Sequence, residues 1–241
     1  MKYLVATRAD SHIDEITEIT HPIIKKFCNI WGADFVVLCG ESVCERGERR
    51  NHYRIMDLWG LFESYDRILS LDSDIIINRN CPNIFEEVPI DCIGTVFEDR
   101  GTRRLARYKR ILSIQDKHGD VGWRDGYINT GVFLSSKQHR NIYTSINGDY
   151  WLGEGEDDVH IGYKIRKEGY KIKELDYRWN HMTMFSEGWN NYRDRFDSYI
   201  IHYAGSGKFD EKDRMSQIMS DATRLDYTKK PYKSTTHFRL I

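Results

Sequence analysis

The stretch Tyr65-Asp-Arg-Ile-Leu-Ser-Leu-Asp72-Ser-Asp74-Ile-Ile-Ile-Asn78 places two carboxylates, one residue apart, inside an apolar run rich in isoleucine. Such a run predicts a buried strand. Buried aspartates are costly unless they are paired, hydrogen-bonded or bound to a metal, and two ionised neighbours also repel each other. A divalent cation removes both costs, because Mg²⁺ and Mn²⁺ bind one or two carboxylates together with the oxygens of a substrate diphosphate. Asp72 and Asp74 therefore indicate a metal and phosphate site. The alternative is a pair of solvated acids at a strand end.

Length and composition limit the class of protein. With 241 residues, 40% hydrophobic and 30% charged, the chain has the make-up of a soluble globular protein, and one α/β domain is the first expectation. The 36 basic and 37 acidic residues leave a formal net charge of −1. A chain with almost no net charge has no overall electrostatic field that attracts nucleic acid, and we therefore expect no nucleic-acid partner. Any anionic substrate must be bound by local positive charges.

The cysteines and the first residues bear on cellular location. The five cysteines are odd in number and lack CxxC spacing, which argues against a secreted disulfide framework and a thiolate zinc site. We therefore expect a reducing, cytoplasmic setting. The apolar run Tyr3 to Ala6 is too short for a signal peptide, and no stretch is long enough to be a transmembrane segment. The sequence leaves the oligomeric state open.

The first forty residues have the pattern of a strand, a helix and a strand. Lys2 to Thr7 and Ala33 to Cys39 predict strands, and apolar residues at helical spacing lie between them, with Pro22 predicting a break in the helix. Such crossovers build parallel sheets. The polar loop Thr7 to His12 follows the first strand, at the sheet edge where ligands of open α/β folds bind.

Two basic features leave alternatives open. Arg54 lies on the predicted helix His52 to Ser64, and it is either a solvated cation or a guanidinium aimed at a bound diphosphate. Arginines and lysines also crowd the segment between Glu98 and Gly122. That segment predicts a solvated helix or a mobile loop, or alternatively a basic lid over phosphates or an acceptor contact.

The segment Tyr127 to Leu134 predicts a strand that carries Asn129 and Gly131 in its middle. Glycine in a strand commonly marks a bulge or a close approach of the backbone to a ligand, and the asparagine amide offers one acceptor and two donors to sugar hydroxyls. The alternative is a plain turn, since Asn-Thr-Gly also occurs in turns.

Three acids in succession, Glu156, Asp157 and Asp158, begin the next predicted helix. Acids at a helix start are ordinary, because they bind free N–H groups and suit the positive end of the helix dipole. Three exceed what capping needs. One of these carboxylates is therefore a candidate to accept a proton from an acceptor hydroxyl or to bind the acceptor.

A short strand near the end of the chain carries His202 into a loop with Gly205, Gly207 and Lys208. Imidazole suits Mn²⁺ better than Mg²⁺, glycines let backbone N–H groups approach phosphate oxygens, and lysine supplies a compact positive charge. A lone histidine is more often a core residue. The combination with glycines and lysine favours a metal ligand.

Together these motifs resemble those of the nucleotide-sugar-dependent glycosyltransferases of the GT-A fold, over roughly residues 1 to 209. The acidic stretch looks like the metal-binding DxD strand of the glycogenin-like family 8 transferases, with an arginine-bearing helix before it. Tyr-Ile-Asn129-Thr-Gly131-Val is similar to that family's Asn-x-Gly segment near the donor sugar. His202-Tyr-Ala-Gly205-Ser-Gly207-Lys208 matches its His-x-x-Gly-x-x-Lys.

The resemblance implies an α/β fold, with a mixed, mainly parallel sheet flanked by helices, and a glycosyltransferase activity. It implies that Asp72, Asp74 and His202 hold Mn²⁺ or Mg²⁺. It implies that Asn129 and Asp157 or Asp158 position the donor sugar or activate the hydroxyl of a carbohydrate or glycoconjugate acceptor. The donor is expected to be a nucleoside-diphosphate sugar, with UDP favoured, bound by Thr7, Arg8, Asp10, Arg54, Asp72, Ser73, Gly205 and Lys208.

The chain departs from the family 8 pattern in two places. Phe209-Asp210 stands where that family has Pro-Trp after the lysine. The segment from Trp151 to Val159 looks more like the acidic segment of inverting galactosyltransferases, in which an aspartate is the base, whereas family 8 enzymes retain configuration. The stereochemical outcome stays open, with more motifs on the retaining side.

We expect a GT-A domain over residues 1–209, with a nucleotide-binding part at about 1–97 and an acceptor-binding part at about 123–209. A C-terminal helix and a poorly ordered basic tail are expected over 210–241. A sugar-phosphate nucleotidyltransferase is an alternative, but it would need a glycine-rich loop where Thr7 to His12 has no glycine. Another is a glycan-binding module without catalysis, with stacking platforms at Trp123, Trp151, Trp179 and Trp189, although core packing also explains the aromatic content.

Overall fold

The computed structural model of the chain describes residues 1–40, 50–185, 189–205 and 211–227. Its strands are β1 (Tyr3–Arg8), β2 (Ala33–Leu38), β3 (Arg67–Leu71), β4 (Ile75–Ile77), β5 (Cys92–Phe97), β6 (Ile128–Ser136), β7 (Lys171–Glu174), β8 (His181–Met182) and β9 (Ile200–His202). Its α-helices are α1 (Asp14–Trp31), α2 (Arg50–Tyr53), α3 (Leu58–Leu61), α4 (Ile84–Glu87), α5 (Arg104–His118), α6 (Glu156–Lys167) and α7 (Glu211–Arg224). Short 3₁₀ turns join them at η1 (Ser11–Ile13), η3 (Arg54–Asp57), η4 (Gly101–Arg103), η5 (Lys137–Tyr143), η6 (Tyr177–Trp179) and η7 (Arg195–Asp197).

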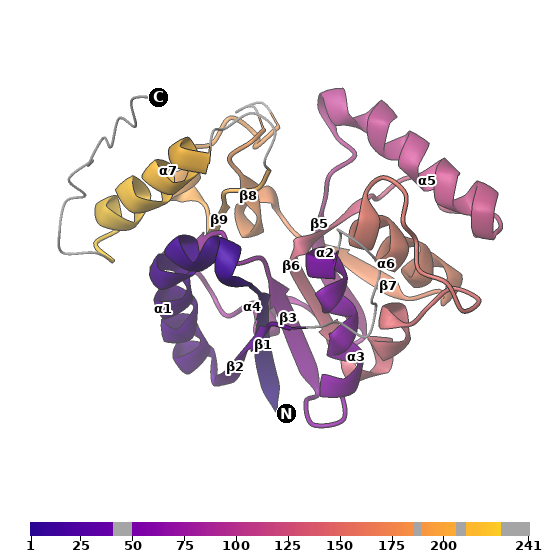
Figure 1. Cartoon of the computed structure of the whole chain (residues 1–241), viewed down its shortest axis with the longest axis horizontal. Coiled ribbons are helices and arrows are strands. Elements are labelled where there is room, and N and C mark those ends of the chain that lie inside the picture. Colours follow the sequence, from indigo (N-terminus) through magenta and orange to yellow (C-terminus); the bar gives the residue numbers. More distant parts are fainter. Residues whose placement is uncertain (41–49, 186–188, 206–210, 228–241) are drawn as a thin grey trace.

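A six-stranded sheet in the order β2-β1-β3-β6-β5-β7 forms the centre of the molecule. β1 is parallel to β2 and β3, β5 is parallel to β7, and β6 is antiparallel to both of its neighbours. Helices lie on both sides, with α1 and α7 next to each other at one side and α5 and α6 at the other (Figure 1). The predicted mixed, mainly parallel α/β architecture is confirmed.

The acidic stretch divides between two sheets and is not the single strand that its pattern predicts. β3 ends at Leu71 and belongs to the large sheet, whereas β4 begins at Ile75 and pairs with β9 in a small sheet of order β4-β9-β8. Of the three polar residues between them, Ser73 turns its carbonyl to the hydroxyl of Thr20, whereas Asp72 N still donates to Gly131 O of β6 and Asp74 O accepts from Tyr203 N. Both aspartates thus stand in a connection at the carboxyl end of β3.

Two helix predictions are wrong in detail. α1 continues unbroken through Pro22, although a proline inside a helix removes a hydrogen bond and costs about 3 kcal/mol. Burial of Ile23, Ile24 and Phe27 offsets that cost, since each such side chain contributes roughly 1.5–3 kcal/mol. The helix expected over residues 52–64 is instead a succession of short turns, α2, η3 and α3.

α7 shares the hydrophobic core of α1 and the small sheet. Its Ile218 and Ala222 are fully buried in one cluster with Ile24, Ile76 and Ile201.

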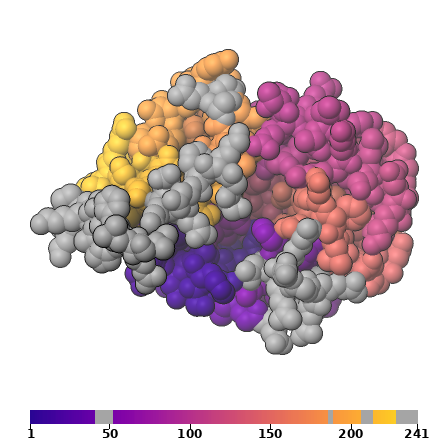
Figure 2. Space-filling model, turned by 45° about the horizontal axis from the view of Figure 1, so that its top comes forward, coloured from indigo at the N-terminus to yellow at the C-terminus, as the bar shows by residue number. Residues whose placement is uncertain are grey.

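The space-filling view shows a depression between the orange and yellow C-terminal segments and the magenta segment that contains α5 (Figure 2). Within the ranges described, none of the helices is both long and apolar enough to cross a membrane.

Candidate active site

Asp72, Asp74 and His202 come together where β3, β4 and β9 meet. Nε2 of His202 lies 3.4 Å from Asp72 Oδ2 and 3.3 Å from Asp74 Oδ1, and one ligand atom from each residue falls within 4.8 Å of the others. The backbone fixes this arrangement, since Asp72 N donates to Gly131 O and Tyr203 N donates to Asp74 O, each at 2.9 Å. Two carboxylates and an imidazole at such spacing suit a single Mn²⁺ ion.

The imidazole of His202 is buried and oriented. Burial alone would lower its pKa, but the charges and hydrogen bonds of Asp74 and Asp72 outweigh this and raise the pKa of His202 to about 10. Burial would raise the pKa of Asp72, yet Arg8 and His202 hold it far below its usual range. Positive charge next to Asp72 and Asp74 is therefore strongly stabilising.

Arg8 links the predicted metal site to the acids of α6. One arm of its guanidinium donates to Asp72, and the other donates to Asp157 Oδ2 at 2.6 Å and to the carbonyl of His52 at 2.8 Å. Its side chain is only 8% exposed. Burial would lower the pKa of Arg8, but the two carboxylates raise it further above its usual value, so the guanidinium stays charged.

Asp157 and Asp158 both contact Thr130 on β6. The Thr130 hydroxyl lies 2.9 Å from a carboxyl oxygen of each, and Thr130 N donates to Asp158 Oδ1 at 2.8 Å. Burial, with the nearby charges of Asp157 and Glu98, raises the pKa of Asp158 well above its usual value. One hydroxyl proton serves two acids here, and a proton held on Asp158 removes the repulsion between them. Neither aspartate is needed as a conventional helix cap.

The side-chain amide of Asn129 is used within the protein. Its Oδ1 accepts from Gly131 N at 2.9 Å and from Asn180 Nδ2 at 2.7 Å, and its Nδ2 donates to Glu98. Glu98 in turn pairs with Arg107 of α5. The predicted sugar-binding asparagine thus stands beside the site as part of a hydrogen-bonded network that also contains Asn180.

The predicted nucleoside loop is held from several sides. Thr7 is fully buried, with its hydroxyl 3.4 Å from His21, and Ser73 Oγ donates to Arg8 O at 2.7 Å. Arg54 donates to the carbonyls of Ala9 and Gly40, and a nitrogen of its guanidinium lies 3.6 Å from Asp10. Arg54 is buried and directed at this loop.

The glycine-lysine loop is described only in part. Gly205 has a left-handed φ of 98°, and a Cβ at this position would touch Met184 Sδ at 3.0 Å. Gly207 and Lys208 lie outside the described residues. The donor contacts predicted for Gly205 and Lys208 stay predictions.

Several site residues were missed at the sequence level. His52 Nε2 lies 3.2 Å from Glu156 Oε2, which forms a second group of possible metal ligands with Asp157. Asn180 Oδ1 accepts a hydrogen bond of 2.8 Å from His202 Nδ1, and Arg214 of α7 lies 3.3 Å from Asp74. No recognisable motif surrounds His52, Asn180 or Arg214 in the sequence. Only the folding of the chain brings these residues close to the site.

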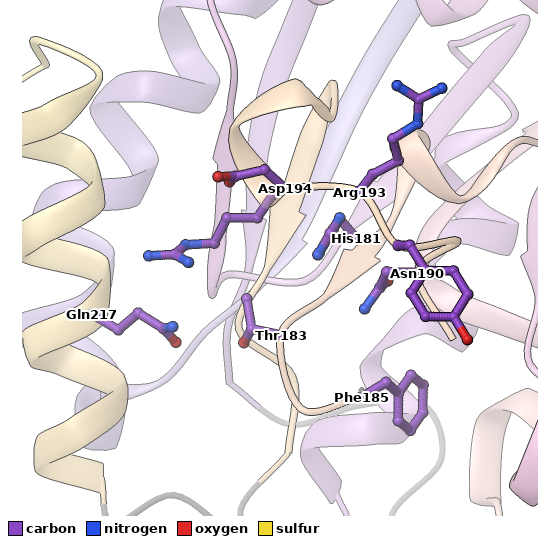
Figure 3. A pocket seen from close by; sticks show the side chains of 9 residues that line it. His181, Thr183, Phe185, Asn190, Arg193, Asp194 and Gln217 are labelled. Carbon is purple, nitrogen blue, oxygen red and sulfur yellow. The ribbon is translucent and has the colours of Figure 1, made fainter. Parts of the chain in front are cut away.

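A hollow of about 280 Å³ lies next to β8, between α7 and the chain that follows β8 (Figure 3). Its lining joins polar and aromatic groups from three segments, and Thr183 N donates to His202 O at 2.9 Å. Thr183, which lines the hollow, is therefore bonded through its backbone to the predicted metal ligand His202. Its rim includes Tyr192, which is 83% exposed and has a left-handed φ of 56°.

Comparisons with known proteins establish the fold. A solved glycosyltransferase involved in the glycosylation of the major capsid of PBCV-1 superposes with a TM-score of 0.62 at 18% identity, over 90% of this chain and 99% of that one. The galactosyltransferase LgtC, solved with donor and acceptor sugar analogues, gives 0.58 at 17% identity, over 97% and 98%. The chain has the GT-A fold. The bifunctional glycosyltransferase WbbM also superposes on this chain, with a TM-score of 0.54 at 12% identity, over 94% of this chain and 51% of that one. No family profile matches the sequence, and no curated protein matches it significantly.

Proposed function

We propose that the protein is a metal-dependent glycosyltransferase, which moves a sugar from a nucleoside-diphosphate sugar, most simply a UDP-sugar, to a hydroxyl of a carbohydrate acceptor. The observation that carries the proposal is the convergence of Asp72, Asp74 and His202 at one edge of a GT-A fold. The GT-A neighbours are glycosyltransferases, and LgtC was solved with donor and acceptor sugar analogues, which supports the same two substrate classes here.

Asp72, Asp74 and His202 are the residues that would hold the cation. Bound there, Mn²⁺ or Mg²⁺ would neutralise charge that develops on the departing diphosphate. The chain's own cations supplement this: Arg8 stands against Asp72, and Lys208 follows Gly205 in a loop whose motif suits a diphosphate. Thr7 and Asp10 belong to the segment assigned to the nucleoside, and Arg54 and Ser73 bind its backbone at the carbonyls of Ala9 and Arg8.

Asp158 is our first choice for proton transfer with the acceptor hydroxyl. Its carboxyl contacts Thr130, and burial with the charges of Asp157 and Glu98 raises its pKa, the direction that favours exchange of a proton over permanent ionisation. Asp157 is bound by Arg8 and Thr130, and we assign it the positioning of that neighbour. Asn129 is assigned a place at the donor sugar through its contact with Gly131, and the stereochemical outcome is left to product analysis.

We place the acceptor in the second half of the chain, at about residues 123–209, and the nucleotide at about residues 1–97. The hollow beside β8 supports the acceptor assignment, because hydroxyl, amide and aromatic groups suit sugar hydroxyls and ring faces. Four described cysteines are free, which agrees with a reducing, cytoplasmic setting.

The test is binding and turnover across a panel of nucleotide sugars. With Mn²⁺ we expect one UDP-sugar to raise the melting temperature and to be slowly hydrolysed, and EDTA to abolish both effects. Asp74→Ala should behave as wild type does in EDTA. If no nucleotide sugar binds or turns over, and Asp74→Ala changes no binding, the proposal is wrong. Metal-independent glycan binding without turnover would instead identify a binding module.

A further inference from the structure

Arg214 places a guanidinium from the C-terminal helix against the acidic pair. Its Nη1 lies 3.3 Å from Asp74 Oδ2, and its side chain is 18% exposed. α7 is held firmly here, because Ile218 is buried in the core and Asp221 pairs with Arg195 through bonds of 2.7 and 2.9 Å. The position of Arg214 at the site is therefore fixed by the fold.

Within the described part of the chain, the contact with Asp74 engages only one nitrogen of the Arg214 guanidinium. A guanidinium has five N–H donors, and a well-made pair with a carboxylate is bidentate at about 2.7–2.9 Å. Arg195 makes such a pair, whereas Arg214 contacts Asp74 through one long bond. Its Nε is buried and has no hydrogen-bond partner among the residues that the structure describes. With Nε buried, a ligand would reach the guanidinium through its Nη groups.

Space for a ligand lies directly beside this side chain. A cavity of about 200 Å³ is bounded by Arg214 and Met215 of α7 and by residues 11–16, which run from the end of the loop assigned to the nucleoside into the start of α1. Arg214 thus stands between Asp74 and a hollow at the carboxyl end of β1.

We propose that Arg214 binds the diphosphate of the donor, next to the cation held by Asp72, Asp74 and His202. The inference rests on the proposed function and adds to it a phosphate ligand from α7. The planar fork of arginine matches two phosphate oxygens, which makes it a stronger partner for a diphosphate than for the carboxylate it now touches at one point. A cation bound at Asp74 would compete with Arg214 for that carboxylate. The guanidinium would then be released to bind the phosphates of the donor, which lie next to the same cation.

The test is calorimetry on Arg214→Gln with three probes: Mn²⁺ alone, UDP with saturating Mn²⁺, and UMP with saturating Mn²⁺. We expect UDP to bind at least fivefold more weakly than to wild type, UMP to lose less, and Mn²⁺ alone to bind at least as tightly. Arg214→Lys, which keeps the charge without the fork, should recover part of the UDP affinity. Arg224→Gln, an exposed arginine on the same helix, should bind all three like wild type.

A loss of UDP affinity smaller than fivefold overturns the inference. So does an equal weakening of Mn²⁺ alone, because Arg214 would then only support the site. Thermal unfolding in EDTA identifies a variant that fails to fold, and Arg214→Lys then carries the comparison. If wild type binds neither UDP nor UMP, the proposed function itself fails, which is distinct from wild type and Arg214→Gln binding equally.

Discussion

His202 Nδ1 donates a hydrogen bond of 2.8 Å to Asn180 Oδ1, and this bond decides which ring nitrogen faces the acids. An amide oxygen can only accept, so Nδ1 carries a proton and Nε2 points at Asp72 and Asp74. Asn180 is itself fixed, because its Nδ2 donates to Asn129 Oδ1. A histidine ligand oriented through its second nitrogen is the common arrangement in metal sites.

Replacement of Asn180 by alanine should weaken Mn²⁺ binding by about 10–100-fold, the usual effect of losing a partner that orients a ligand. Calorimetric titration with Mn²⁺ measures this. Asn83→Ala is the control, since Asn83 caps α4 and should cost about 1 kcal/mol of stability without changing Mn²⁺ affinity. Unchanged Mn²⁺ affinity in Asn180→Ala would show that the contact does not orient a ligand.

Gly131→Ala should damage the same site from the side of β6. A Cβ at this position would lie 2.4 Å from His202 Cε1 and 2.9 Å from Asp72 Oδ2, so these side chains must move. We expect a loss of roughly 1–3 kcal/mol in unfolding free energy together with weaker Mn²⁺ binding. Gly60→Ala, in α3 with open space around it, should leave both properties nearly unchanged. Wild-type Mn²⁺ affinity in Gly131→Ala would contradict the tight packing.

The pH dependence of stability should carry the signature of His202. Its pKa in the folded chain, about 10, is above the ordinary value of 6.5. Its stabilising contribution is therefore complete below pH 6.5, declines at up to about 1.4 kcal/mol per pH unit above it, and is lost above pH 10. In EDTA, the difference in unfolding free energy between wild type and His202→Gln should shrink across this window. If the difference in unfolding free energy between wild type and His202→Gln did not change with pH, the raised pKa of His202 would be refuted.

Asp158→Asn should separate stability from activity. The amide oxygen can still accept from Thr130 N, and the variant avoids the cost of either ionising or protonating a carboxyl beside Asp157, so the unfolding free energy at pH 8 should be equal or higher. Transfer activity should fall about 10²–10⁴-fold if Asp158 moves the proton. Asp157→Asn should instead destabilise the protein, because Arg8 loses one of its two anions. Wild-type activity in Asp158→Asn would remove it from the mechanism.

Tyr192→Ala tests the acceptor assignment. An exposed aromatic ring at the rim of the hollow beside β8 can stack on a sugar face. Its loss should raise the KM for the acceptor several-fold, while hydrolysis of the donor without acceptor stays at the wild-type rate. If the KM for the acceptor and the rate of donor hydrolysis changed by the same factor, Tyr192 would not be an acceptor-binding residue.

Much of the sheet could be predicted, because alternating or continuous apolar runs mark strands locally. The strands predicted at Lys2 to Thr7 and Ala33 to Cys39 form within one residue of those bounds as β1 and β2, and their parallel pairing followed from the crossover between them. The split between β3 and β4 could not be predicted, since β4 leaves the large sheet only because β9 offers it a partner. Pro22 misled for a similar reason: tertiary burial outweighed a local preference.

The candidate site shows the same division. Asp72, Asp74 and His202 carried recognisable spacing and were predicted as a cluster, which the geometry brings together. Asn180 and Arg214 have no motif around them, and their roles depend on distances set by packing. No pattern in the sequence indicates that Arg8, expected at the nucleoside, pairs with Asp157, which lies 149 residues further along the chain.

The pairing of β4 with β9 has a consequence for the order in which the molecule forms. β4 is made of three isoleucines, and the strand beside it begins only at Ile200. Chain synthesis proceeds from the amino terminus, and contacts distant in sequence form slowly. The six-stranded sheet ends at Glu174 and can assemble first. The predicted metal site is therefore among the last parts to be completed during synthesis, and a chain that stops short of His202 leaves the three isoleucines of β4 without their partner strand and prone to aggregate.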